Sequence, residues 1–173
     1  RLNQMIESML LIARLEHGEY QKDVTPIHLH SMVNELVDYF SFLAEDKQIK
    51  LQILIESDAV LIGHAVLVER AIANLISNSI DHGSLESKVQ IKAQTDASYI
   101  VVSVFTSDVH IDDIHLPRLF DRFYQVESSR HASGKTGGLG LAIVKSIMQL
   151  HQGQVLVENL DDGVIFRLVF PNV

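Results

Sequence analysis

Apolar residues recur at steps of three and four in four stretches of this chain, the spacing that gathers them on one face of an α-helix. The spacing predicts helices over residues 1–17, 29–47, 64–82 and 139–152. The first carries an apolar stripe about two heptads long, which is too short for a stable coiled coil by itself. We therefore expect this stripe either to pack on the core of the domain or to pair with a helix that this sequence lacks.

Alternation of apolar and polar residues between turn residues predicts strands elsewhere. The predicted strands cover residues 23–28, 49–55, 59–62, 89–95, 99–106, 154–159 and 164–170. Pro26 would place the first of them at a sheet edge. The order of elements indicates an α/β (α+β) fold, a two-layer sandwich of a mixed, mostly antiparallel sheet with helices on one face, preceded by one N-terminal helix.

Periodicity fails between residues 107 and 137, where polar residues and glycines dominate. The exception is a cluster of aromatic side chains: Phe120, Phe123 and Tyr124. A loop of this length inside a compact domain is uncommon and often serves as a lid or a binding loop. Arg122 and Arg130 could reach an anionic ligand from it. Surface arginines beside an aromatic anchor would give the same pattern.

The composition allows one medium domain with a substantial core, because 47% of the 173 residues are hydrophobic. Cysteine is absent, which excludes disulfides, a thiolate nucleophile and a cysteine-based zinc site. Fourteen Lys and Arg residues oppose 22 Asp and Glu residues, a formal net charge of −8. We expect no nucleic-acid partner, because nucleic acids bind basic faces.

The sequence shows neither a membrane-spanning segment nor a signal segment. No apolar run approaches the ~20 residues that span a bilayer, and no signal segment opens the chain. The chain begins at Arg1 without a methionine, which suggests a fragment of something longer.

Two asparagines, Asn74 and Asn78, lie four residues apart and share one face of the helix predicted over residues 64–82. Asparagine is a mediocre helix former, because its amide competes for nearby backbone groups. A carboxamide oxygen is also a neutral, hard ligand for Mg²⁺. A solvated polar face gives the same spacing, and the spacing alone favours that simpler interpretation.

Glycines lead directly into the last predicted helix. Residues 136–144 read Thr-Gly-Gly-Leu-Gly-Leu-Ala-Ile-Val. Without Cβ atoms the backbone can approach a ligand closely, and amides at a helix start can face an anion. We favour phosphate contact over a merely flexible loop, because the glycines gather at the helix start.

Other familiar sites are excluded. Gly134-Lys135-Thr136 resembles the end of a P-loop, but that pattern needs a glycine where Ser129 stands and a strand just before the loop. The nine histidines show no metal-ligand spacing beyond the pair His28 and His30. No Ser/His/Asp set and no dinucleotide-binding fingerprint can be identified.

Taken in order, these segments resemble the catalytic and ATP-binding domain of bacterial sensor histidine kinases, in the superfamily shared with gyrase and Hsp90-type chaperones. The helix with Asn74 and Asn78 resembles the N box, residues 120–123 resemble the F box, and residues 138–144 resemble the G2 box. Each box alone is a weak signal, but their order and spacing together are specific.

The resemblance extends to the start of the chain. Residues 5–13 resemble the second helix of the dimerisation hairpin, and with residues 115–120 they are similar to heavy-metal (copper and silver) sensor kinases. The resemblance divides the chain into residues 1–18, part of the dimerisation region, and residues 19–173, the catalytic ATP-binding domain.

The resemblance implies ATP and Mg²⁺ as cofactors, with catalysis by positioning and charge neutralisation. Asn78 would hold Mg²⁺ against the phosphates. Asn74 would be the catalytic position, where the hydrolases of the superfamily carry a glutamate base. An amide cannot accept a proton as a carboxylate does, which suits transfer to a histidine rather than to water. The nucleotide-binding residues would be Asn74, Asn78, Thr106, Asp108, Phe120, Arg122, Arg130, Gly138, Leu139, Gly140 and Leu141.

The sequence departs from the family pattern in three places. In the G1 box, Thr106 stands where an aspartate accepts the adenine amino group, and Asp108 stands where a glycine is usual. Asp81 and His82 follow the N box in place of a basic and an aromatic residue, and Thr136 replaces the first G2 glycine. The G1 departures favour an alternative, a degenerate, weakly or non-nucleotide-binding module that serves as a scaffold, whereas the intact asparagine pair and the G2 helix disfavour it.

None of the nine histidines lies in a phosphoacceptor motif, so the acceptor would lie on a dimerisation helix outside this chain. The resemblance implies a response regulator as the next partner and a homodimer formed through the dimerisation helices. It also implies a cytoplasmic location, with membrane contact only through the missing parts of an inner-membrane sensor. An ATP-hydrolysing chaperone or topoisomerase module is disfavoured because Asn74 replaces the base.

Overall fold

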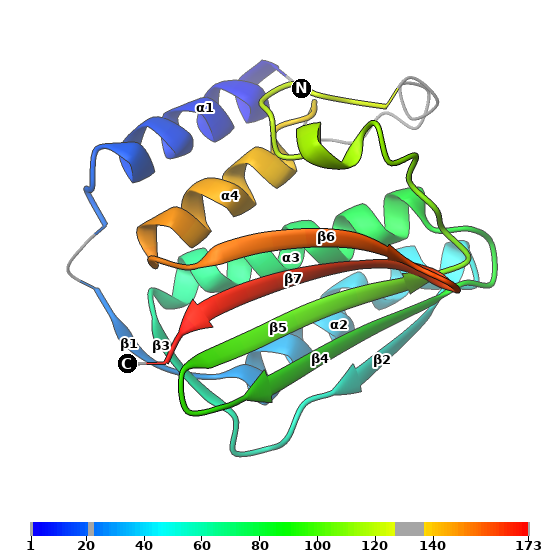
Figure 1. Ribbon diagram of the computed structural model, residues 1–173, viewed down its shortest axis with the longest axis horizontal. Coiled ribbons are helices and arrows are strands. Elements are labelled where there is room, and N and C mark those ends of the chain that lie inside the picture. Colours follow the sequence, from blue (N-terminus) through cyan, green and yellow to red (C-terminus); the bar gives the residue numbers. More distant parts are fainter. Residues whose placement is uncertain (1, 21–22, 127–136, 173) are drawn as a thin grey trace.

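The computed structural model describes residues 2–20, 23–126 and 137–172. One face of a five-stranded sheet is covered by three helices, and a fourth helix lies on the outer side of one of them (Figure 1). The helices are α1 (Leu2–Glu16), α2 (Leu29–Asp46), α3 (Ala65–His82), the 3₁₀ turn η1 (Leu116–Arg118) and α4 (Gly140–Leu150). The strands are β1 (Thr25–His28), β2 (Lys50–Leu54), β3 (Val60–Gly63), β4 (Lys88–Thr95), β5 (Tyr99–Ser107), β6 (Gln154–Leu160) and β7 (Gly163–Pro171).

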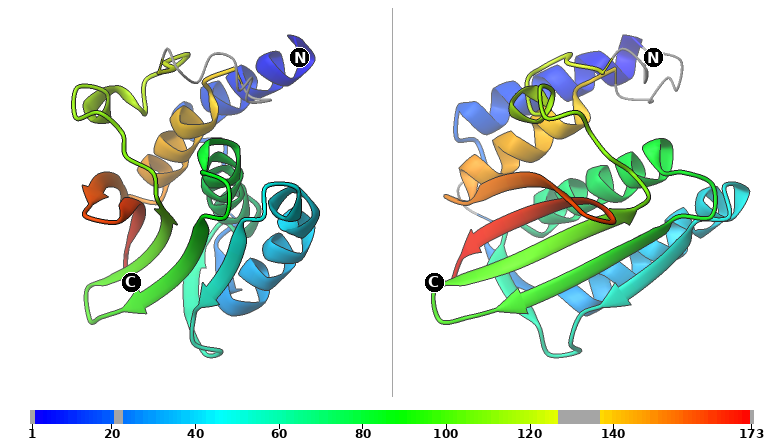
Figure 2. Two further views of the ribbon diagram at one scale, coloured as in Figure 1. Left: turned by 90° about the vertical axis from the view of Figure 1, so that its right-hand side faces the viewer. Right: turned by 45° about the vertical axis from the view of Figure 1, so that its right-hand side comes forward.

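The large sheet has the strand order β2-β4-β5-β7-β6. Only β2 and β4 run parallel, and the other three pairs are antiparallel. Strands β1 and β3 form a separate antiparallel pair. The predicted two-layer sandwich of a mixed, mostly antiparallel sheet with helices on one face is therefore confirmed. Figure 2 shows the opposite face of this sheet without a covering helix.

The core lies between the sheet and α2, α3 and α4. Alternate residues of β5 and β7 point inward and are buried, because successive side chains of a strand point to opposite faces. The strand register places Val104 opposite Phe166 and Thr106 opposite Val164. Burial of each such apolar side chain stabilises the fold by about 1.5–3 kcal/mol. Thr106, at the end of β5, is the only polar member of the inward-facing row on that strand.

Helix α1 has two different faces. One face buries Leu11, Ile12 and Leu15 and packs on α4. The other leaves Leu2 and Leu10 exposed at 70% and 53%. The expectation that the stripe packs on the core is therefore confirmed for one face of the helix, whereas the described residues leave the other face exposed, and its pairing with another helix stays a prediction. In the described ranges, no helix has the length and apolar character needed to cross a bilayer.

A histidine pair joins the start of α3 to the end of α4. The backbone N–H of His64 donates to Nε2 of His151 at 3.0 Å, and Nδ1 of His151 lies 2.8 Å from the carbonyl oxygen of Ile147. This geometry assigns the proton of the neutral ring to Nδ1, because Nε2 must accept. The ring of Tyr20 packs edge-on against His64, so the segment after α1 also contacts this junction.

Candidate functional site

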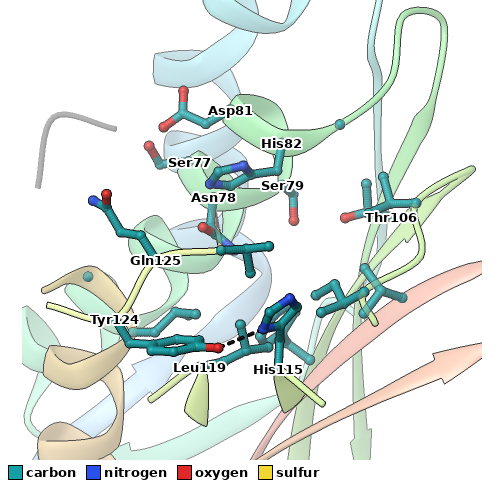
Figure 3. A pocket seen from close by; sticks show the side chains of 18 of the residues that line it. Ser77, Asn78, Ser79, Asp81, His82, Thr106, His115, Leu119, Tyr124 and Gln125 are labelled. Atoms are coloured by element: carbon teal, nitrogen blue, oxygen red, sulfur yellow. Dashed lines mark hydrogen bonds between the residues drawn. The ribbon is translucent and has the colours of Figure 1, made fainter. Parts of the chain in front are cut away.

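A cavity of about 550 Å³ lies between the C-terminal half of α3, the segment over residues 109–126 and the start of α4 (Figure 3). The ends of β5 and β7 close it from the side of the sheet. It therefore lies at the opposite ends of α3 and α4 from the histidine junction.

Helix α3 contributes a polar stripe to the cavity wall. The stripe pairs Asn74 with Asn78 and Ser77 with Asp81, each four residues apart, and all four residues line the cavity. Another side of the helix is apolar and completely buried. Its fully buried members include Ala71, Ile72, Leu75 and Ile76. The asparagine face is thus not a solvated outer face, which was the simpler interpretation of its spacing.

The asparagines have unused hydrogen-bonding capacity. Nδ2 of Asn74 is buried and has no hydrogen-bond partner among the described residues. The side chain of Asn78 points into the cavity and likewise makes no hydrogen bond within the described ranges. A buried polar group without a partner costs roughly 1–3 kcal/mol, so Nδ2 of Asn74 is expected to have its partner in a ligand, and half-buried Asn78 presents its amide to the same cavity.

The start of α4 faces the polar stripe. Gly138 and Gly140 line the cavity, and Gly138 adopts φ +81°, which favours glycine. A Cβ at Gly138 would lie 3.0 Å from the backbone of Phe123, so the close approach of these two segments also requires glycine. No side chain caps the first turn of α4. Its free amides can therefore bind an anion.

The segment over residues 109–126 forms the outer wall. Leu119 and Tyr124 line the cavity, and the Tyr124 hydroxyl lies 2.6 Å from Nδ1 of His115. The guanidinium of Arg118 lies 4.4 Å from the centre of the Tyr124 ring, a cation–π contact. These contacts hold the aromatic ring against the mouth of the cavity.

The charges around the cavity are unusual for an anion site. Its described lining contains two carboxylates and three histidines but no lysine or arginine: Asp81, Asp112, His82, His110 and His115. Burial lowers the pKa of His82, and Lys47 lowers it further, whereas the carboxylate of Asp81 opposes the shift. The lowered pKa of His82 favours its neutral form, and the described lining holds no lysine or arginine, so a phosphate ligand here would depend on helix amides and on a cation bound with it.

A metal ion at this site would need help from the ligand. In the part of the chain that the structure describes, no cluster of three or more His, Cys, Asp or Glu side chains could hold a metal ion. Mg²⁺ usually keeps several waters and shares one or two protein oxygens with substrate phosphates. The unbonded amide of Asn78 fits that mode of binding.

The structure brings together six of the predicted site residues: Asn74, Asn78, Thr106, Gly138, Gly140 and Leu141. Four others lie outside the cavity lining. Leu139 is completely buried beneath the start of α4. The ring of Phe120 packs edge-on against Phe166, at 6.3 Å between ring centres. Arg122 pairs with Glu16 of α1.

Asp108 occupies a turn rather than the cavity wall. It adopts φ 59°, a left-handed conformation that glycine favours and aspartate tolerates. Its carboxylate accepts a hydrogen bond from the Ser107 hydroxyl at 2.7 Å. Asp108 therefore serves the backbone geometry where the family pattern has glycine. Arg130 and Thr136 lie outside the described residues.

Several lining residues were not predicted from the sequence. Ser77 follows Asn74 by three residues, so helical spacing could have identified it. Val164 and Phe166 lie beside the cavity because β7 pairs with β5, which strand prediction alone does not reveal. His110 and Asp112 lie in an irregular segment, where no periodic signal marks them.

Three comparisons with known proteins agree with this geometry. Residues 63–173, more than half of the chain, match the family model described as "Histidine kinase-, DNA gyrase B-, and HSP90-like ATPase". The matched range contains all of the residues that line the cavity.

Two curated relatives show similarity over almost the whole chain. Sensor histidine kinase CusS of Escherichia coli O157:H7 is 34% identical over 171 residues, which cover 99% of this chain and 35% of the relative. Sensor protein CzcS of Cupriavidus metallidurans is 34% identical over 172 residues, which cover 99% of this chain and 36% of the relative. The chain thus spans about a third of the length of these relatives.

Solved structures share the fold. The catalytic domain of histidine kinase ThkA superposes with a TM-score of 0.75 at 23% identity, covering 86% of this chain and 95% of that domain. Full-length ShkA in complex with AMPPNP gives a TM-score of 0.84 at 20% identity, over 98% of this chain and 35% of that one. ThkA in complex with response regulator protein TrrA gives 0.77 at 21% identity, over 100% of this chain and 48% of that one.

Proposed function

Because the chain belongs to the histidine kinase-, DNA gyrase B- and HSP90-like ATPase family, we propose that its cavity binds Mg–ATP for phosphoryl transfer to a protein histidine. One observation carries the proposal. The side-chain amides of Asn74 and Asn78 face the uncapped, glycine-rich start of α4 across one cavity, and the described residues supply no hydrogen-bond partner to Nδ2 of Asn74 or to Asn78. Hard oxygen ligands and free backbone amides are the two groups that a metal-bound polyphosphate requires.

Each group then has a defined role. The amide oxygen of Asn78 holds Mg²⁺, and the backbone amides at Gly138 and Gly140 hold phosphate oxygens. Leu119 and Tyr124 exclude water from one side of the nucleotide. Mg²⁺, when bound, neutralises phosphate charge, which matters here because the described lining has no lysine or arginine.

Asn74 favours transfer over hydrolysis. It lies one helical turn before Asn78, beside the expected phosphates. A carboxamide cannot take a proton from water, so Asn74 positions groups without activating a competing nucleophile. The acceptor is then a histidine brought to the cavity by another segment of the protein.

The similarity to sensor histidine kinases also supports a cellular location and an oligomeric state for the proposed kinase. We propose that the domain lies on the cytosolic side of a membrane sensor, where ATP is available, and that the protein works as a homodimer. The shared fold with ThkA, whose structure was solved with the response regulator TrrA, supports a response regulator as the partner that receives the phosphoryl group.

Calorimetric titration of Mg–ADP and Mg–ATP into the purified chain tests the proposal. We expect binding in the micromolar range, with a loss of at least tenfold in affinity for Asn78→Ala, about 1.4 kcal/mol or more. Arg122→Ala is the matched control and should bind normally, because the Arg122 side chain pairs with Glu16 outside the cavity. Absence of heat at millimolar nucleotide would contradict the proposal and favour the scaffold alternative.

A further inference from the structure

The cavity has two chemically different ends. Figure 3 shows Thr106 on the opposite side of the cavity from Ser77 and Gln125, which lie near the polar stripe of α3. The wall beside Thr106 is apolar, since Val164 is its cross-strand partner. Further apolar lining residues come from the neighbouring segment and from β7: Val109, Ile111 and Phe166. With phosphates at the polar end, this apolar slot has the chemistry to take the flat, heteroaromatic base of a nucleotide.

Thr106 is held rigidly at the floor of this slot. It lies on β5 between Val89 of β4 and Val164 of β7, and it is only 2% exposed. Its hydroxyl oxygen points into the cavity and makes no hydrogen bond to any described residue. The hydroxyl of Ser79, a second buried residue of the lining, is also unbonded within the described ranges. The slot therefore presents free hydroxyl groups to a bound base.

The carboxylates of the lining do not take this role. Asp81 lies on the side of α3 that turns away from Thr106 (Figure 3). One oxygen of Asp112 accepts a hydrogen bond from the amide of Ile114 at 3.2 Å, and this bond orients the carboxylate within its own turn. The buried polar groups placed to contact the edge of the base are consequently hydroxyls, those of Thr106 and Ser79.

A hydroxyl and a carboxylate select bases differently. A carboxylate only accepts hydrogen bonds, so it favours an amino group and repels a carbonyl oxygen. A hydroxyl can rotate to accept from an amino group or to donate to a carbonyl oxygen. Strong discrimination arises when the wrong base leaves a buried polar group without a partner. Thr106 finds a partner on either kind of base.

We infer that Thr106 makes the base slot tolerant of both 6-amino and 6-oxo purines, so that guanosine and inosine nucleotides bind this domain nearly as well as adenosine nucleotides. The inference rests on the proposed nucleotide site and specifies its substrate class. The tolerance belongs to the folded site itself, because Thr106 is buried near the end of β5, the central strand of the sheet.

Titration of Mg–ADP, Mg–GDP and Mg–IDP into the purified chain tests this inference, and diphosphates avoid turnover during the measurement. We expect the three Kd values of the unmodified chain to agree within about tenfold. Thr106→Asp should weaken Mg–GDP and Mg–IDP by about a hundredfold relative to Mg–ADP. Ser103→Asp, on the outward face of the same strand, is the matched control and should leave the ratio unchanged.

The outcomes separate the two proposals. Tight Mg–ADP binding with rejection of Mg–GDP and Mg–IDP by more than about a hundredfold in the unmodified chain would overturn the inference but leave the proposed function intact. Failure of all three nucleotides to bind would overturn both. The comparison within the unmodified chain decides the matter even if Thr106→Asp fails to fold.

Discussion

Gly163 is a single residue on which the geometry of Thr106 depends. A Cβ atom at this position would lie 2.2 Å from the carbonyl oxygen of Thr106 and 2.7 Å from the ring of Phe105. The first of these atoms belongs to the backbone of a central strand and cannot move without disturbing the sheet. Gly163 is therefore required for the close packing of β7 on β5 rather than for an unusual backbone angle.

We expect Gly163→Ala to lower the free energy of unfolding by about 1–3 kcal/mol, the usual cost of overpacking. It should also weaken nucleotide binding, because the backbone of Thr106 must shift. Urea denaturation and the titration above would measure both effects. Asp161→Ala, in the same hairpin turn, is exposed and should change stability by less than about 0.5 kcal/mol. Equal stability of the two variants would contradict this account.

The residues of the site differ in how far the sequence could predict them. The four-residue spacing of Asn74 and Asn78 placed them on one helix face, but it could not tell a solvated face from a cavity wall. That distinction depends on α4, which approaches from more than 60 positions further along the chain. Arg122 could not be placed either, because its partner Glu16 lies 106 residues away in sequence.

At the scale of elements, α3 and α4 carry the polar groups of the cavity at one end and the histidine junction at the other. The bond from the His64 amide to Nε2 of His151 requires an unprotonated Nε2. Burial lowers the pKa of His151 below its ordinary value of 6.5, and the neighbouring His64 lowers it further. The hydrogen bond to the Ile147 oxygen opposes this shift. The junction therefore favours neutral His151.

This junction predicts that the domain loses stability in mild acid. As the pH falls below 6.5, His151 takes up a proton in the unfolded chain but not yet in the folded one, so the free energy of unfolding falls. The loss continues until the pH passes the lower pKa of the folded state. Thermal unfolding between pH 7.5 and 5 would measure the decrease in Tm.

His151→Gln is the informative variant for this prediction. It removes the titrating group, so its Tm should depend less steeply on pH than that of the unmodified chain. Some pH dependence of the Tm should remain in this variant. Burial also lowers the pKa of His82, so His82 likewise reduces the stability of the folded chain as the pH falls. An unchanged pH dependence in His151→Gln would show that the junction does not titrate as described.

Strands with a clear alternation of apolar and polar residues could be predicted from the sequence. The short elements were missed or were located without their pairing partners. Alternation over β4, β5 and β7 located these strands to within about two residues, because half of their side chains enter the core. The turn η1 was not predicted, since three residues that include Pro117 carry no period. The pairing of β1 with β3 in a separate sheet was also not predicted, because strand location does not specify partners.

At the scale of the molecule, α1 offers an apolar surface that the described part of the chain leaves exposed. The exposed side chains on this face are Leu2, Ile6, Met9 and Leu10. The opposite face of α1 is already occupied by α4. A second copy of the chain could cover the exposed face in the same way that α4 covers the buried one, which agrees with the proposed homodimer.

We therefore expect the chain to self-associate at least weakly. Sedimentation at increasing concentration should show a dimer, and the pair of substitutions Ile6→Glu and Leu10→Glu should abolish it by placing charges at the contact. Phe42→Glu is the matched control, because Phe42 is 74% exposed on α2, at the far side of the helical layer from α1. A strictly monomeric profile of the unmodified chain at high concentration would contradict this prediction.

The position of β7 between β5 and β6 has a consequence for biosynthesis. During translation β5 emerges more than 50 residues before the strand that covers its free edge. Until residue 168 has left the ribosome, Val102 and Val104 do not both have their partners Leu168 and Phe166, and β5 has one unpaired edge. Domains whose pairings are this distant in sequence fold late and slowly, and they expose aggregation-prone strand edges meanwhile. The nascent domain therefore exposes an unpaired edge of β5 until β7 is available to cover it.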